Sequence, residues 1–468
     1  MDAFRSPRLV TFVRWLVLVA LAADSRTAVA KDPPVKPQKA AKGAATKAEV
    51  VARAMARLDE DVTVSERDMN EQHRIFTQSI AGLCFLLDPA AGKGAVHADR
   101  VDRMAESIGR YVDGAARHFE GAKKAADDEM AAMEWSQTTW SLGAAAIFYG
   151  ECLARGVRRK DATARLRTIG DLLARSQQPD GGFGHDKDGR PRIPEIEMPM
   201  PGGGVKKMKY PNTLLSASNW AANALGICRA VSGKKLDAAI TKAKAYYAAS
   251  REGEGSYPYD PSQKGSGGGD LSAVARTAGS FVALRSMGLP GRDRDLARTG
   301  SFLARHVDDL PEGHGSSPHG VFFGAIATTM LGGEPRKEFE KTVVARIVAG
   351  QDAETGALDC ICRHGGVTTC ESFKSDDNFM LKMAGKDCLA WIRAYVTALN
   401  LFALVCEKGK MKLLDGLPEG DASAEPATTP SDGSDMGSDA PPAGPSTPAP
   451  PSTPPPPLPP TPTGPTFK

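Results

Sequence analysis

Four cysteines and one histidine lie close together in the last third of the sequence, at spacings that suit two kinds of chemistry. Thiolate and imidazole groups at such spacings can complete a tetrahedral zinc site. In an oxidising compartment, the same cysteines instead form one or two disulfides. We favour disulfides, keep zinc and unmodified thiols as alternatives, and predict no other cofactor. The disulfide candidates are Cys360, Cys362, Cys370 and Cys388, and the zinc candidates are Cys360, Cys362, His364 and Cys370.

Three aspartates in the same region are candidates for a proton donor. Asp376 and Asp377 are adjacent, and Asp387 opens an apolar segment. A proton-donating carboxyl group needs a pKa that is raised by burial and by neighbouring charge. An adjacent aspartate pair ahead of a helix is more often a helix cap in a solvated turn. We therefore keep all three as catalytic candidates and leave the activity open.

A second group of candidates combines aromatic rings with histidine and aspartate near the start of apolar segments. Where helices surround a cavity, residues at the helix ends line its mouth, and such side chains bind a sugar or an isoprenoid. The alternative for each residue is a capping or core role. The cavity candidates are Trp135, Trp140, Trp220, Asp270, His314 and His319.

The segments that must position these residues are almost all helical. Six are rich in alanine, glycine and aromatic residues and carry few charges, as buried helices do. They are His73–Leu87, Trp135–Leu153, Thr213–Val231, Leu271–Gly288, Ser317–Gly333 and Asp387–Cys406. Amphipathic segments alternate with them and begin near Ala48, Val101, Asp161, Leu236, Asp293 and Pro335.

This alternation predicts an all-α fold of six helical hairpins, an (α/α)6 toroid with the apolar helices inside. An inner ring within an outer ring buries every apolar face. A superhelical solenoid of helix pairs is the alternative. Strand patterns are hard to find in the sequence, and the insertion at 190–211 is a candidate lid.

Similar turns follow several of the amphipathic helices. The clearest reads QQPDGGF at 177–183, a second reads QDAETGALD at 351–359, and a more degenerate one reads REGEGSY at 251–257. In each, a helix ends, glycine makes a tight turn, and an apolar residue folds back on the core. These turns resemble the repeats of the terpenoid cyclase and protein prenyltransferase superfamily, including bacterial prenyltransferase and squalene-oxidase repeat proteins. The resemblance spans residues 130–400.

That resemblance implies a toroid and, in the active members, chemistry on isoprenoids. Squalene–hopene cyclases protonate substrate with an Asp-x-Asp-Asp motif, which this chain lacks. Protein prenyltransferases bind zinc through an Asp-x-Cys pair, whereas Asp387 and Cys388 are adjacent here. We therefore expect a divergent relative that binds an apolar ligand, a carbohydrate or a protein partner. An active isoprenoid enzyme and a carbohydrate-active (α/α)6 enzyme remain alternatives.

The two ends of the chain have compositions unlike the rest. Residues 1–30 are typical of a signal peptide, and 31–47 form a basic flexible linker. The proline-rich tail at 416–468 is too poor in apolar residues to fold, which leaves 48–415 for the toroid. We expect export to the periplasm or the extracellular space, with no stable membrane span after cleavage. The net charge of +3 does not indicate a surface that binds nucleic acid.

Overall fold

The computed structural model contains one helical unit that can be described in detail. Contacts divide the chain into Met1–Ala424 and Glu425–Lys468, and every described residue lies in the first unit. The predicted signal peptide, the proline-rich tail and nearly all of the basic linker fall outside the described residues. The described residues are 45–65, 71–89, 97–121, 138–184, 195–199, 205–209, 213–259, 261, 272–312, 317–362, 372–374, 389–407 and 409–415.

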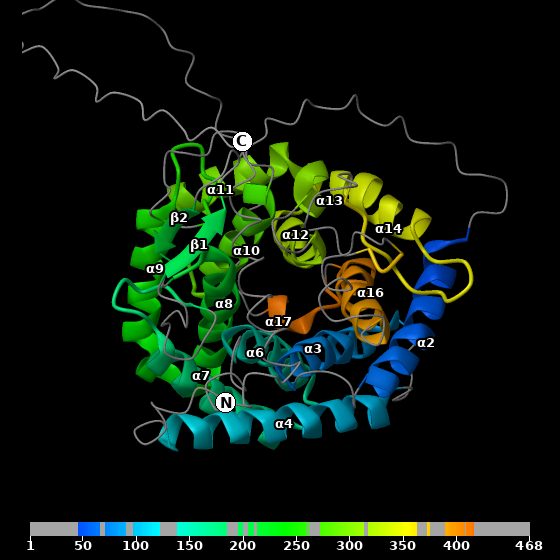
Figure 1. Cartoon of the computed structure of the whole chain (residues 1–468), viewed down its shortest axis with the longest axis horizontal. Coiled ribbons are helices and arrows are strands. Elements are labelled where there is room, and N and C mark those ends of the chain that lie inside the picture. The colour runs from blue at the N-terminus through cyan, green and yellow to red at the C-terminus, as the bar shows by residue number, and fades with distance from the viewer. Residues whose placement is uncertain are drawn as a thin grey trace, which may run out of the picture. The chain divides into compact units, whose positions relative to one another are not determined.

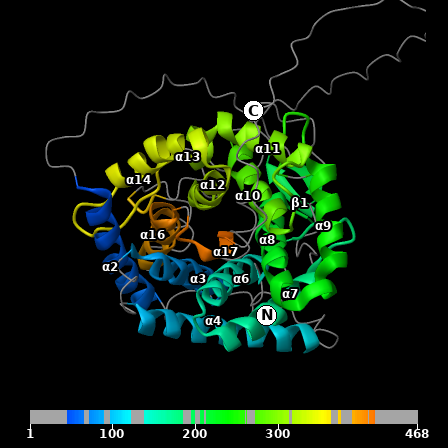
Figure 2. The same cartoon turned by 180° about the vertical axis from the view of Figure 1, so that it is seen from behind.

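The described part is dominated by helices packed together, as the sequence predicts. Each of the six apolar segments forms a helix whose residues are largely buried. These inner helices are α3 (Glu71–Leu87), α6 (Thr138–Arg155), α8 (Leu215–Ser232), α10 (Ser272–Ser286), α12 (Ser317–Leu331) and α16 (Leu389–Val405). Figures 1 and 2 both show them surrounded by the remaining long helices.

The amphipathic segments form the surrounding, outer helices. One of them, α13 (Gly333–Phe339), continues through the π-helical turn η6 (Glu340–Val344) into α14 (Ala345–Ala349). The others have an apolar stripe toward the inner helices; in α7 the stripe includes Leu166, Ile169 and Leu173. The outer helices are α2 (Lys47–Ser65), α4 (Ala98–Gly121), α7 (Arg159–Ser176), α9 (Asp237–Ser250), α11 (Arg294–Arg305) and α13 (Gly333–Phe339).

Packing links the inner helices in cyclic order. Helix α3 packs against α6, α6 against α8, α8 against α10 and α10 against α12. Helix α12 then packs against α16, and α16 packs back against α3. Short 3-10 turns, η3 (Gly233–Leu236) and η5 (Val307–Glu312), connect neighbouring helices.

One element differs from the sequence prediction. Strands β1 (Glu195–Pro199) and β2 (Val205–Lys209) form an antiparallel hairpin within the insertion between α7 and α8. The register pairs Glu195 with Lys209 and Pro199 with Val205. Glycine and proline throughout this insertion obscured the strand pattern, because both residues are typical of loops.

The three turns identified in the sequence share one backbone geometry. Gly181, Gly255 and Gly356 have positive φ angles of 91°, 102° and 77°, which favour glycine. Each also lies against the next outer helix. A Cβ atom on these glycines would lie 2.2, 2.6 and 3.2 Å from a backbone carbonyl oxygen of α9, α11 and α2, respectively. The turns therefore fix the spacing of successive outer helices.

The residue two positions after each glycine attaches the turn to an inner helix. Its backbone N–H donates to a serine or threonine hydroxyl on α8, α10 or α16. The pairs are Phe183 with Ser218 at 2.9 Å, Tyr257 with Thr277 at 3.1 Å and Leu358 with Thr397 at 3.2 Å. Each turn thus contacts an inner helix and an outer helix at once.

The first residue of each turn reaches the next outer helix through its side chain. Gln177 Nε2 donates to its turn glycine at 3.0 Å and to the Ala239 carbonyl in α9 at 2.8 Å. Gln351 Nε2 donates to its turn glycine at 2.8 Å and to the Val50 carbonyl in α2 at 2.9 Å. In the third turn, Arg251 forms an ion pair with α11 at 2.5 Å. The turn at 351–359 is thereby bonded to α2, the first described helix.

A buried ion cluster adds a second contact between the first and last long helices. Asp61 of α2 is fully buried and accepts from Arg57 Nε at 2.9 Å and from Arg393 Nε of α16 at 2.6 Å. Both guanidinium groups also bond its other carboxylate oxygen. The two arginines neutralise a carboxylate whose burial alone would be costly.

The last helix, α17 (Lys412–Asp415), packs near the C-terminal end of α6. Buried Glu151 accepts the backbone N–H groups of Lys412 at 3.0 Å and Leu413 at 2.9 Å. It also pairs with Arg155 at 2.6 Å. Figures 1 and 2 draw α17 in the middle of the inner helices.

Candidate ligand-binding site

The structure brings together three of the residues proposed for a ligand cavity. The His319 ring lies 5.1 Å from the Trp140 ring and 5.5 Å from the Trp220 ring, measured between centroids. The two tryptophan rings are 6.4 Å apart. They come from α12, α6 and α8, so only the packing of these inner helices brings them together.

Two further aromatic residues complete the group. Phe76 of α3 stacks on His319 with ring centroids 5.3 Å apart and an interplanar angle of 20°. The Tyr395 hydroxyl of α16 is hydrogen-bonded to His319 Nε2 at 2.8 Å. We call Phe76, Trp140, Trp220, His319 and Tyr395 the aromatic cluster. Phe76 and Tyr395 were not predicted from the sequence, although each occupies the same part of its helix as the other three.

The cluster lies at one end of the inner helices. Each member falls within about the first two turns of its helix, counted at 3.6 residues per turn. Because the five rings touch one another, the N-terminal ends of these helices must lie together. Helix α17 packs near the opposite end of α6, beside Gly150 and Glu151.

The rings that surround His319 make it an unusual histidine. Desolvation lowers its pKa from 6.5 to about 3, because the charged imidazolium loses its hydration among the surrounding rings. The imidazole is therefore neutral at pH 7, with one ring nitrogen bonded to Tyr395. A neutral imidazole can donate or accept one hydrogen bond to a ligand but carries no charge.

The cluster has an exposed side and a buried side. Trp140, His319 and Tyr395 are partly exposed, whereas Phe76 and Trp220 are buried. The buried Trp220 Nε1 atom has no hydrogen-bond partner among the described residues. Buried donors in native proteins are usually satisfied, so a group of this kind is a candidate contact for a ligand or a water.

A second set of rings extends the cluster along α16. Trp391 lies 4.9 Å from the His73 ring and 6.4 Å from the Tyr395 ring, between centroids. Its Nε1 atom is also buried and has no partner within the described part of the chain. Cys360 and Phe373, from the loops that precede α16, pack against the buried cluster of Trp391, Ile392 and Val396.

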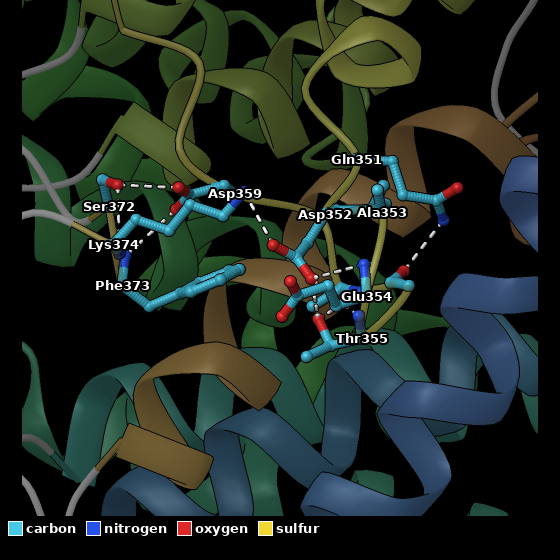
Figure 3. A network of polar contacts seen from close by, with 12 residues as sticks. Gln351, Asp352, Ala353, Glu354, Thr355, Asp359, Ser372, Phe373 and Lys374 are labelled. Carbon is cyan, nitrogen blue, oxygen red and sulfur yellow. Dashed lines mark hydrogen bonds and ion pairs between the residues drawn. The ribbon is translucent and has the colours of Figure 1, made fainter. Parts of the chain in front are cut away.

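A polar network fixes the loop segment that carries Phe373 (Figure 3). Asp359 accepts from the Ser372 hydroxyl at 2.7 Å and from the Phe373 N–H at 3.0 Å. Burial raises the pKa of Asp359. On the other side, Lys374 pairs with Asp352 at 2.7 Å. The bonds from Lys374 and Thr355 lower the pKa of Asp352. This network braces the loop beside the rings.

Of the predicted cysteine cluster, only Cys360 and Cys362 are described residues, so the disulfide and zinc predictions stay predictions. Cys360 and Cys362 have their Sγ atoms 3.3 Å apart, longer than the ~2.05 Å of a disulfide bond, so these two are not joined. No group of three potential metal ligands occurs among the described residues. Four other cysteines, Cys84, Cys152, Cys228 and Cys406, are fully buried.

Several candidates from the sequence lie outside the described residues. They include half of the cavity candidates, all the catalytic candidates and the rest of the cysteine cluster. These residues are Trp135, Asp270, His314, Asp376, Asp377, Asp387, His364, Cys370 and Cys388.

No protein-family model matches this chain, and no curated protein is significantly similar to it. Among the described helices, none is long and apolar enough to cross a membrane.

Proposed function

We propose that this chain is an exported (α/α)6 toroid that binds an apolar ligand at the aromatic cluster. In this proposal it is a divergent relative of the terpenoid cyclases and protein prenyltransferases, without the catalytic acid motif of the cyclases. The ligand is an isoprenoid-like molecule that carries a hydrogen-bonding oxygen.

The cyclic packing of the inner helices supports the toroid. An open solenoid would leave its first and last repeats apart. Here the last turn bonds to α2 through Gln351, and Arg393 of α16 pairs with Asp61. The turns at Gly181, Gly255 and Gly356 repeat one geometry, which supports descent from a repeated unit.

The observation that carries the binding proposal is the partly exposed face of Trp140, His319 and Tyr395. These side chains come from three inner helices and meet at one end of the bundle. Rings and a neutral imidazole favour an apolar molecule, because they offer contact area without fixed charge. The indole N–H of Trp220, which has no partner among the described residues, favours a ligand with an acceptor oxygen.

The same chemistry favours binding over proton-initiated cyclisation. A general acid must hold its proton at the working pH, whereas the pKa of His319 is lowered to about 3. No member of the aromatic cluster is a carboxylic acid. Within the described part of the chain, the buried carboxyl groups have structural contacts. Asp61 is neutralised by two arginines, Glu151 caps α17 and Glu312 pairs with Arg346. Burial raises the pKa of Asp359, but its carboxyl group is bonded to Ser372 and Phe373 in the loop and is not a member of the aromatic cluster.

Intrinsic tryptophan fluorescence tests this proposal, because three of the five tryptophans lie in or beside the cluster. We expect farnesol to change the emission saturably and cellohexaose to leave it unchanged. Trp140→Leu should weaken farnesol binding about tenfold, equal to about 1.4 kcal/mol. The matched control is Phe302→Leu in α11, a buried ring outside the cluster, which should bind like the wild type.

Two outcomes would contradict the proposal. Saturable binding of cellohexaose without farnesol binding would instead favour a carbohydrate protein. Equal farnesol affinities for wild type and Trp140→Leu would remove the aromatic cluster as the site.

A further inference from the structure

We propose that Cys360 and Cys362 form a redox modification site, which closes to an intramolecular disulfide by exchange with a small-molecule disulfide such as oxidised glutathione. Their Sγ atoms lie 3.3 Å apart in the reduced pair. Bond formation therefore needs an approach of about 1.3 Å, since a disulfide bond is ~2.05 Å long. The inference does not depend on the proposed ligand.

The backbone around the pair is anchored at several points. The Cys360 N–H donates to the Asp359 carboxylate at 2.8 Å, and Asn400 of α16 donates to the Asp359 carbonyl at 2.8 Å. Between the two cysteines, the Ile361 carbonyl accepts a hydrogen bond from Arg346. A fixed backbone keeps the two thiols at a high effective concentration, which favours closure over two separate mixed disulfides.

Exposure distinguishes this pair from the buried cysteines. Cys360 and Cys362 are both partly exposed, so a dissolved disulfide can reach them. The pKa of Cys152 and the pKa of Cys406 are each raised to about 12 by burial. Because the thiolate is the reacting species, these buried groups are nearly inert at neutral pH.

The exchange has two balanced steps. A thiolate of the pair attacks one sulfur of oxidised glutathione, which releases one glutathione and leaves a mixed disulfide. The second thiolate then attacks the protein sulfur, the S–S bond between Cys360 and Cys362 forms, and the second glutathione leaves. The two protein thiols lose two electrons and two protons, and one glutathione disulfide becomes two glutathione thiols.

Closure would also alter the surroundings of the aromatic residues. Cys360 packs against the buried cluster of Trp391, Ile392 and Val396, and the Trp391 ring lies 4.9 Å from His73 and 6.4 Å from Tyr395. Cys360 therefore lies near the rings that extend the aromatic cluster along α16.

Peptide mapping of the full chain tests the proposal. The reduced protein is incubated with oxidised glutathione, quenched in acid, alkylated after unfolding and digested with trypsin. Cleavage after Arg346 and Arg363 yields peptide 347–363, which holds Cys360 and Cys362 but neither Cys370 nor Cys388. We expect this peptide unalkylated and two hydrogens lighter than its dithiol form. The buried cysteines should be oxidised at least about tenfold less.

Two variants sharpen the result. In Cys362→Ser, Cys360 should keep glutathione as a mixed disulfide, because the thiol that lies 3.3 Å away and would displace it has been removed. Cys228→Ser, which removes a buried thiol, should leave closure of the pair unchanged. A disulfide from peptide 347–363 to the peptide of Cys370 or Cys388 would overturn the proposal. Recovery of that peptide with two alkyl groups, or with two glutathiones, would overturn it as well.

Discussion

At the scale of single residues, the ring contacts of His319 set the chemistry of the site. Phe76 stacks on one face of its imidazole, and Tyr395 bonds Nε2. These neighbours remove water without supplying a counter-charge, which is why the pKa of His319 is lowered to about 3. The residue therefore acts as a neutral hydrogen-bonding group in an apolar site.

This environment predicts a specific pH dependence of folding. Between pH 6.5 and about 3 the unfolded chain protonates His319 more than the folded chain, so folded stability decreases as pH falls through that window. His319→Phe removes this contribution. From pH 7 to pH 5, urea unfolding should show wild type losing up to about 2 kcal/mol more than the variant. Equal losses in the two proteins would contradict the neutral imidazole.

At the scale of elements, the three repeated turns set how neighbouring helices are spaced. Gly181 combines a positive φ of 91° with close contact to α9, where an added Cβ atom would lie 2.2 Å from the Lys242 carbonyl. Two separate demands, backbone conformation and close approach, therefore fall on one residue. A substitution at another glycine with positive φ can separate the cost of the backbone conformation from the cost of the close contact.

Gly156 provides that separation, because it has a similar φ of 74° but nothing within 4 Å of an added Cβ atom. Gly156→Ala should lower the free energy of unfolding by about 1 kcal/mol, the cost of the left-handed conformation. Gly181→Ala adds a clash with the α9 backbone and should lose about 3 kcal/mol or more. Chemical denaturation measures both. Similar losses would show that the turn does not fix α9.

The sequence predicts the helices well because their causes are local. Runs of small and apolar residues such as those of α6 and α16 mark buried helices, and the stripe at Leu166 and Ile169 marks an amphipathic one. The hairpin at β1 and β2 was not predicted. Its strands are only five residues long and lie among the prolines and glycines of the insertion, which are typical of loops.

The site was only partly predictable for a related reason. Trp140, Trp220 and His319 stand out by residue type, whereas Phe76 and Tyr395 resemble ordinary core residues. The stacking of Phe76 on His319 joins α3 to α12, so it depends on tertiary packing. The sequence shows Cys360 and Cys362 as part of a cysteine cluster, but only the structure gives the 3.3 Å separation of their Sγ atoms.

At the scale of the whole described unit, contacts between the first and last long described helices support the proposed ring over an open stack. The Gln351 amide bonds the Val50 carbonyl, and Asp61 lies between Arg57 and Arg393. The ion cluster is buried, so removing one partner leaves unpaired charge in a low-dielectric site. Its loss should loosen both helices together.

Asp61→Asn should therefore lower the free energy of unfolding by about 3 kcal/mol. Hydrogen exchange should accelerate in both α2 and α16, because the cluster joins them. Glu334→Gln serves as the control. Its pair with Lys337 has side chains 83% and 73% exposed, so the change should stay within about 0.5 kcal/mol. Faster exchange in α2 alone would argue against ring closure at this contact.

A crystal structure of the full chain grown with farnesol tests the central claim most directly. We predict ligand density against the exposed faces of Trp140, His319 and Tyr395, with an oxygen within hydrogen-bonding distance of an imidazole or indole nitrogen. Farnesol bound elsewhere, or the aromatic cluster unchanged and empty at saturating ligand, would contradict the proposed binding site.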